Sequence, residues 1–245
     1  MDRTLPGKSL EWQFDALWQR FERLSYTTDT LRSLPARIRR WLMPVNVSFI
    51  IPIEDQAVCD YLGRAQEGLK PHMAYAPQPA ERLHITLFEL GFLRSIPFQL
   101  RGIWSRTQLD QIADLVGQYM SLVKPFEVQI GPVNAFPNVA IVEVHDLGKL
   151  RLLNGVISQA VPPLQLPLPR FPMVPHVTLG FFGMRPAAPI RNTIRPMRNW
   201  PPIPFLVDHV DLTLYYPQPG PYSLSRILQH SVEEVIVTLP LGTTR

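Results

Sequence analysis

Two copies of one short motif carry the residue types best suited to chemistry. The first copy is His84-Ile85-Thr86-Leu87 and the second is His176-Val177-Thr178-Leu179. Successive side chains of a strand point to opposite faces. If each motif is a strand, its histidine and threonine share one face and its two aliphatic residues share the other. Each motif therefore predicts an imidazole and a hydroxyl held side by side by a buried apolar pair.

Two such pairs facing each other would be sufficient to cleave a phosphodiester. Imidazole titrates near neutral pH, so one ring can accept a proton while the other donates one. The hydroxyls of Thr86 and Thr178 can hold the non-bridging phosphate oxygens. Glu81 and Glu89 flank the first motif, but no carboxylates flank the second in the same way. We therefore expect no metal ion and no cofactor.

The other histidines strengthen the case for the repeated motif. A single histidine in a strand is usually structural, so one copy would be weak evidence. Of the six histidines, only His84 and His176 have threonine two places later and leucine three places later. We interpret His72 and His145, which lie in other contexts, as structural.

The chain around the motifs has the hydrophobic patterns of alternating strands and helices. Both motifs follow a strand, a helix and a proline-rich loop, in that order. Strands are predicted at 45–51, 83–90, 126–130, 139–144, 174–182, 205–216 and 233–239, and helices at 10–24, 54–70, 108–122 and 147–161. A turn from Gly131 to Asn138 joins two of these strands. We predict a loop for the proline-rich and arginine-rich stretch 185–204, and a solvated basic face for 31–43.

Composition limits the class of protein. The 245 residues are 46% apolar and 18% charged, which is typical of a globular domain. The net charge of +4 and pI near 9.4 favour an anionic ligand, such as a phosphate or a short oligonucleotide. Cys59 is the only cysteine, which excludes an intramolecular disulfide. The sequence shows no membrane span and no signal peptide, so we expect a cytoplasmic monomer.

These motifs resemble those of a known superfamily. His84-Ile85-Thr86-Leu87-Phe88-Glu89-Leu90-Gly91 resembles the H-x-T-L-x-x-L-G motif of the two-histidine (2H) phosphoesterases, in the LigT-like branch of "2′-5′ RNA ligases" and RNA cyclic phosphodiesterases. Pro175-His176-Val177-Thr178-Leu179 resembles the second motif of that branch, and Phe136-Pro137-Asn138 resembles its F-P turn. The resemblance covers roughly residues 45–240.

The resemblance implies both a fold and a reaction. The fold would be α+β and bilobal, with two antiparallel sheets related by a pseudo-twofold axis, helices outside and a cleft between the lobes. Residues 45–245 would form this domain, and residues 1–44 would be an N-terminal helical extension. The reaction would open 2′,3′-cyclic phosphates of RNA ends or nucleotides to 2′-phosphates without metal. In that scheme His176 is the base, His84 is the acid, and Thr86 and Thr178 bind the phosphate.

Two other functions stay open at this point. The same groups could act as a 2′-5′ RNA ligase or 2′-5′ phosphodiesterase, or the chain could be a binding module for RNA ends or nucleotides. Phe136, Phe182, Tyr215 and Tyr216 are candidates for stacking on a base. Arg185, Arg191, Arg195 and Arg198 could meet an RNA backbone. The sequence departs from many relatives after the second motif, where Phe181 and Phe182 stand in place of a basic residue.

Overall fold

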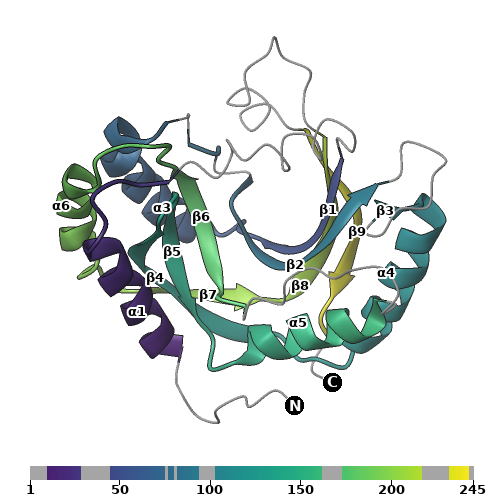
Figure 1. Cartoon of the computed structure of the whole chain (residues 1–245). Coiled ribbons are helices and arrows are strands. Elements are labelled where there is room, and N and C mark those ends of the chain that lie inside the picture. The colour runs from purple at the N-terminus through teal and green to yellow at the C-terminus, as the bar shows by residue number, and fades with distance from the viewer. Residues whose placement is uncertain are drawn as a thin grey trace, which may run out of the picture.

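The computed structural model describes residues 10–28, 45–74, 77–79, 82–93, 103–161, 173–216 and 232–242. Helices and strands alternate along much of the chain (Figure 1). The helices are α1 (Leu10–Glu22), α3 (Gln56–Leu69), α4 (Arg106–Met120), α5 (Lys149–Ala160), α6 (Ala187–Met197) and the short 3-10 turn Lys70–His72. The strands are β1 (Asn46–Pro52), β2 (His84–Leu93), β3 (Ile103–Trp104), β4 (Phe126–Phe136), β5 (Val139–His145), β6 (His176–Phe181), β7 (Ile203–Val207), β8 (His209–Tyr216) and β9 (Val232–Pro240).

The strands of the described residues form one curled sheet. Its order is β7-β4-β5-β6-β2-β1-β8-β9, and β3 pairs with β2 outside this path. The order is symmetric about the contact between β6 and β2, and all neighbours on the path are antiparallel. This arrangement confirms the α+β class. The two expected sheets are the two halves of the curl, which the pairing of Ile85 with Val177 joins into one.

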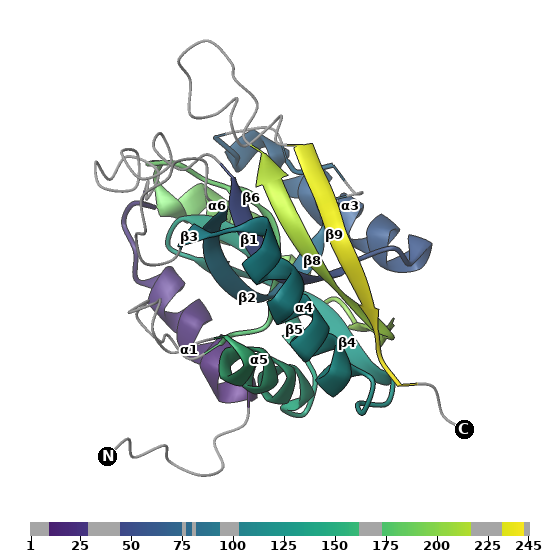
Figure 2. The same cartoon turned by 90° about the vertical axis from the view of Figure 1, so that its right-hand side faces the viewer.

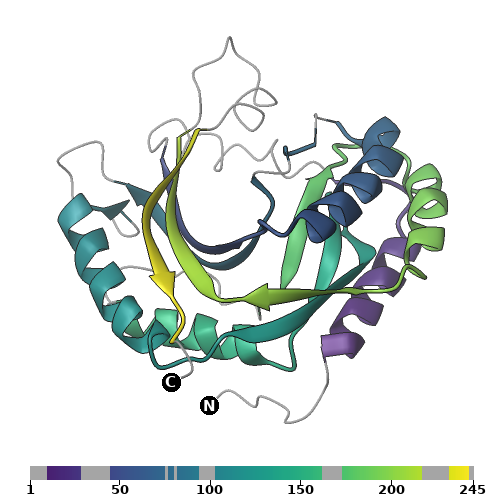
Figure 3. The ribbon, with the colours of Figure 1, turned by 180° about the vertical axis from the view of Figure 1, so that it is seen from behind.

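The helices lie outside the curl, as views from two sides show (Figures 1 and 3). Helix α3 contacts β6 and α6, and α6 also contacts β4, so these helices cover one half of the sheet. Helix α5 contacts β2 and α4, and α4 contacts β9, so these cover the other half (Figure 2). Each of α3 and α5 connects two strands of one half but packs against the other half. This exchange ties the halves together.

Local sequence signals explain where two of these helices begin. The Asp55 side chain accepts a hydrogen bond from the backbone N–H of Val58 and so caps α3. Ser105 and Gln108 form a capping box at the start of α4, each side chain bonding the backbone of the other residue. The apolar faces of both helices are buried, which confirms the helices predicted at 54–70 and 108–122.

The structure corrects the prediction of a loop at 185–204. Residues Ala187–Met197 form helix α6, whose buried face carries Ala187, Ile190, Ile194 and Met197. Pro189 lies in the first turn, where a backbone N–H has no partner within the helix, so proline costs little there. Pro196 lies in the last turn. Because the stretch is rich in proline, its amphipathic helix was not predicted from the sequence. The basic stretch 31–43 lies outside the described residues.

The turn between β4 and β5 is also shorter than the predicted turn from Gly131 to Asn138. Strand β4 continues through Gly131 to Phe136, with a register shift against β5 between Ile130 and Val133. The tight turn consists of Pro137 and Asn138 alone. Phe136 is therefore the last residue of β4, which sets where its ring can lie.

The predicted N-terminal helix is present as α1 and packs against β4, β5 and α6. Phe14 and Phe21 are buried in this contact, and Asn134 of β4 donates a hydrogen bond from its side chain to the carbonyl of Phe14. The boundary between residues 44 and 45 stays a prediction. Among the described residues, no helix is long and apolar enough to cross a membrane.

Candidate active site

The two His-x-Thr motifs lie next to each other because β2 and β6 are neighbours. The strands pair antiparallel at Ile85 and Val177, the central residues of the two motifs. An antiparallel register places His84 across from Thr178, and Thr86 across from His176. The two histidines are then diagonal neighbours, at a spacing of about 7 to 8 Å between strand positions. Residues far apart in the sequence thus share one site.

All four polar side chains share one face of the sheet. Ile85, Leu87, Val177 and Leu179 are buried, each at most 2% exposed. Helices α5 and α3 reach these strands from outside, where Asn154 bonds the carbonyl of Leu87 and Gln66 bonds that of Leu179. The histidines and threonines alternate with the apolar residues and are half-buried. They therefore project to the concave side of the curl.

Backbone carbonyls hold both imidazoles in the same orientation. Nδ1 of His84 lies 2.7 Å from the carbonyl oxygen of Arg82, and Nδ1 of His176 lies 2.7 Å from that of Val174. A carbonyl oxygen only accepts hydrogen bonds, so Nδ1 carries a proton in each ring. Nε2 is therefore the atom that gains or loses a proton in both histidines. The two histidines therefore have the same tautomer, with the proton of the neutral ring on Nδ1.

Burial lowers the pKa of both imidazoles below the ordinary value for histidine, which favours their neutral forms. Burial is the main cause that lowers the pKa of His84, and the nearby His176 lowers it further, while the hydrogen bond to Arg82 opposes the shift. Burial also lowers the pKa of His176, against the hydrogen bond to Val174. A bound anionic phosphate would favour the charged form and raise these values again. The site therefore suits one neutral and one charged imidazole around a phosphate.

An aromatic ring meets each histidine, from a strand two places away in the sheet. Phe136, at the end of β4, meets His176 edge-on with ring centroids 5.1 Å apart. Tyr215, near the end of β8, meets His84 with ring centroids 5.6 Å apart. The prediction of a stacking role for Phe182 is wrong, because Phe182 is fully buried and packs on Phe21 in the core. Phe136 is half-buried beside the site.

The sequence analysis missed a contact that involves a carboxylate. The Tyr215 hydroxyl donates a hydrogen bond to Oε1 of Glu233, its cross-strand neighbour on β9, at 3.1 Å. The same hydroxyl oxygen lies 3.2 Å from Nδ1 and 3.5 Å from Nε2 of His84. Tyr216 points to the opposite face and bonds Glu234, near Arg106. No sequence signal marks Glu233, because its role depends on the register of two distant strands.

The four arginines of 185–198 each have a partner within the protein, and three of them lie on helix α6 or at its end and not in a loop. Arg185 bonds the carbonyls of Pro71 and Met73, and Arg191 bonds that of Leu24. Arg195 pairs with Glu22, and Arg198 pairs with Glu143 and Asp15. Each of these side chains already has a partner within the chain, and contact with an RNA backbone stays a prediction.

Arg198 is part of a buried polar network beside α1. Its Nη1 lies 2.8 Å from Oε1 of Glu143, which also accepts from Asn134 at 2.6 Å. Oε2 of Glu143 lies 3.0 Å from Nε2 of His145. This agrees with the structural interpretation of His145. His72 is structural as well, since its Nε2 lies 2.7 Å from the hydroxyl of Thr193 on α6.

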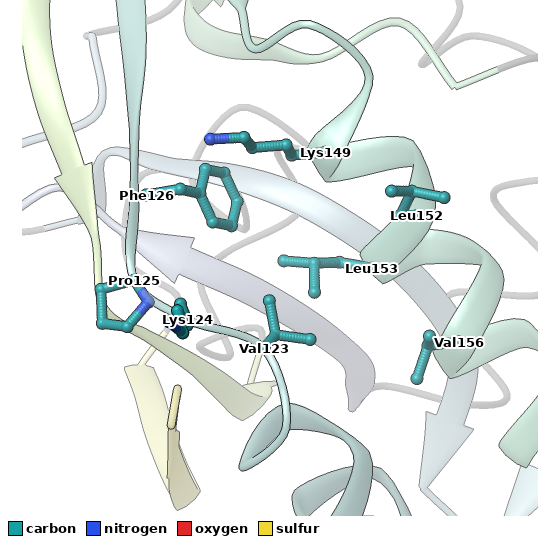
Figure 4. A pocket seen from close by; sticks show the side chains of 8 residues that line it. All are labelled: Val123, Lys124, Pro125, Phe126, Lys149, Leu152, Leu153 and Val156. Carbon is teal, nitrogen blue, oxygen red and sulfur yellow. The ribbon is translucent and has the colours of Figure 1, made fainter. Parts of the chain in front are cut away.

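An open cavity of about 450 Å³ lies elsewhere, between α5 and the start of β4 (Figure 4). Its walls are mostly apolar and are formed by Val123, Lys124, Pro125, Phe126, Lys149, Leu152, Leu153 and Val156. None of the predicted site residues lines it. Within the part of the chain that the structure describes, no three histidine, cysteine, aspartate or glutamate side chains are grouped to hold a metal ion.

Known proteins share this fold. The protein TT0787 of Thermus thermophilus is 20% identical, with a TM-score of 0.54, over 82% of this chain and all of that one. The E. coli LigT protein, solved with 3′-AMP, is 16% identical, with a TM-score of 0.54, over 80% of this chain and 97% of that one. A protein solved as a phosphoesterase is 16% identical, with a TM-score of 0.56, over 81% of this chain and 99% of that one. No curated protein matches the sequence.

A family model matches most of the chain directly. The family is described as the 2′-5′ RNA ligase superfamily, and the match runs over residues 55–230. This range includes both His-x-Thr motifs and their surrounding strands. The chain therefore belongs to the 2′-5′ RNA ligase superfamily, which supports an enzyme that acts on phosphodiesters.

Proposed function

We propose that this protein is a phosphodiesterase that hydrolyses 2′,3′-cyclic phosphates, at RNA ends or in nucleotides, to 2′-phosphates. In this proposal His84 and His176 are the catalytic residues, Thr86 and Thr178 bind the phosphate, and no metal takes part. One observation carries it. The pairing of Ile85 with Val177 sets two imidazoles and two hydroxyls on one face of the sheet.

The reaction follows from the tautomers. Neutral His176 accepts a proton at Nε2 from a water molecule, whose oxygen attacks the phosphorus. The bond between phosphorus and the 3′-oxygen breaks, and His84 gives its Nε2 proton to that oxygen. The products are a 2′-phosphate and a free 3′-hydroxyl, and the two histidines have exchanged protonation states. The Thr86 and Thr178 hydroxyls donate hydrogen bonds to the non-bridging oxygens as charge develops on them.

The proposed substrate class rests on the solved structures that share this fold and on Phe136, the aromatic residue beside His176. LigT has been solved with 3′-AMP, a nucleotide, and has the same fold. Phe136 is half-buried next to His176, which makes it our candidate for contact with a nucleoside. A phosphate held between the histidines would place its nucleoside at one of the two aromatic rings.

Ligation is the second candidate. The description of the family names 2′-5′ RNA ligases, and attack on the same cyclic phosphate by a hydroxyl group uses the same acid and base as attack by water. Formation of a 2′-5′ bond would replace the attacking water with the hydroxyl of a second RNA. Both candidates need the same two histidines, so only the products distinguish them.

The test uses nucleoside 2′,3′-cyclic phosphates and a short RNA that ends in a cyclic phosphate, both in EDTA. We expect the protein to release 2′-phosphates and not 3′-phosphates. His84→Ala and His176→Ala should each lower turnover by about 100-fold or more, the usual contribution of a general acid or base. His72→Ala is the matched control, because the His72 ring bonds Thr193 of α6 and not a residue of either motif, and it should keep the activity.

Three results would contradict the proposal. Activity that disappears in EDTA and returns with a metal ion would refute the metal-free mechanism. Joined RNAs with a 2′-5′ bond, without hydrolysis, would favour ligation. Tight binding of the cyclic phosphate without turnover would favour a binding module.

A further inference from the structure

The sheet is nearly symmetric, but the surroundings of the two histidines are not. The order of strands from the centre outward is β2-β1-β8 in one half and β6-β5-β4 in the other. Tyr215 near the end of β8 and Phe136 at the end of β4 thus occupy related places, and each ring meets the histidine of its own half. The difference is one hydroxyl. Tyr215 has it and Phe136 does not.

We propose that Tyr215, held by Glu233, is a positioning residue that makes His84 the proton donor of the pair and leaves His176 as the base. This inference rests on the proposed function and assigns the two roles within it. The two motifs of this chain hold their histidines in nearly the same way, so something outside the motifs has to distinguish them.

The hydrogen bonds give the direction of the effect. The Tyr215 hydroxyl donates its proton to Oε1 of Glu233 at 3.1 Å and is also hydrogen-bonded to Thr213. If Thr213 uses one lone pair of the phenol oxygen, the other can face His84. The oxygen lies 3.2 and 3.5 Å from the two ring nitrogens, over which the charge of an imidazolium is spread. A partial negative charge there stabilises the protonated ring. This contact favours His84 as the ring that carries the extra proton when phosphate is bound, and it acts against the neighbouring His176, which lowers the pKa of His84.

The Glu233 carboxylate keeps the Tyr215 phenol protonated. Burial and the nearby Glu233 raise the pKa of Tyr215 well above its ordinary value of 10.0, so the phenol stays protonated. Burial also raises the pKa of Glu233, while the hydrogen bond from Tyr215 and the nearby Arg82 oppose that shift. The phenol therefore acts as a fixed dipole and does not itself transfer a proton.

Several charged or titratable groups surround His84 among the described residues. His176 faces it from β6, Tyr215 from β8 and Glu233 from β9 behind the tyrosine, while Arg82 precedes β2. Asp211 of β8 acts on Glu233. Around His176, burial and the carbonyl of Val174 account for the shift, and the neighbouring ring of Phe136 has no polar group.

The test measures the pKa of each histidine by nitrogen NMR of the full chain without substrate. Resonances are assigned with His84→Gln and His176→Gln. Tyr215→Phe should lower the pKa of His84 by about one unit, the order expected for one lost hydrogen bond to a charged group, and should leave His176 unchanged. Glu233→Gln should shift His84 in the same direction. Tyr216→Phe, a control on the opposite face, should change neither histidine.

The pH profile of turnover gives a second measurement. The alkaline limb of kcat reports the acid, so Tyr215→Phe should move that limb about one unit lower and leave the acidic limb in place. An unchanged or higher His84 pKa in Tyr215→Phe, or an equal shift of both histidines, would overturn the inference. No turnover by the unmodified protein, with the NMR shift present, would contradict the proposed function and would still show that Tyr215 raises the pKa of His84.

Discussion

The link between α1 and the half of the sheet that contains β4 and β5 can be tested through Arg198. Its guanidinium reaches from the end of α6 to Glu143, to Asp15 of α1 and over the ring of Trp18. The Glu143 side chain is 3% exposed and that of Arg198 is 16% exposed. Arg198→Met keeps most of the aliphatic stem but leaves a buried carboxylate without its cation.

The expected magnitude follows from these contacts. Removing one partner of a buried ion pair costs about 3 to 5 kcal/mol, because the other charge stays buried. Glu143 keeps its contacts with Asn134 and His145, so we expect the lower end, about 3 kcal/mol. Arg195→Met is the matched control. Its pair with Glu22 is exposed, with side chains 60% and 38% accessible, and should contribute at most about 0.5 kcal/mol.

The assay is urea unfolding at about pH 8, followed by tryptophan fluorescence, with the free energy of unfolding taken from the midpoint and slope. Arg198→Met with Glu143→Gln should recover at least half of the loss, because the unpaired charge is then absent. A loss below about 1 kcal/mol for Arg198→Met, or losses that simply add in the double variant, would refute the reasoning.

Two further predictions concern pH and a helix cap. Burial lowers the pKa of His84 and His176 below 6.5, so between the folded-state values and 6.5 the unfolded chain binds more protons. The free energy of unfolding should then fall as pH decreases from about 7.5 to about 5.5, by at most about 1.4 kcal/mol per pH unit for each histidine. His84→Gln with His176→Gln should flatten this dependence, and an unchanged slope in urea titrations would contradict it. Ser105→Ala removes the capping box of α4 and should cost about 1 kcal/mol in the same assay, whereas Ser121→Ala at the exposed end of α4 should cost little.

Local patterns predicted most of the elements. The strands at both motifs and the helices at 54–70 and 108–122 follow from periodicity and from residues close in sequence. The repeat of His-x-Thr was visible for the same reason. Helix α6 was missed because prolines usually break helices, and their positions in the first and last turns became clear only in the folded chain.

The sequence by itself determined which residues can transfer a proton and which face of each strand they share, because a strand alternates its side chains. Only the tertiary structure decided what surrounds them. The pairing of β2 with β6 brings the motifs together, and the curl of the sheet brings Tyr215 to His84 and Phe136 to His176. Phe182 looks the same as Phe136 in the sequence but lies in the core. These contacts join strands far apart in the chain, so no local pattern encodes them.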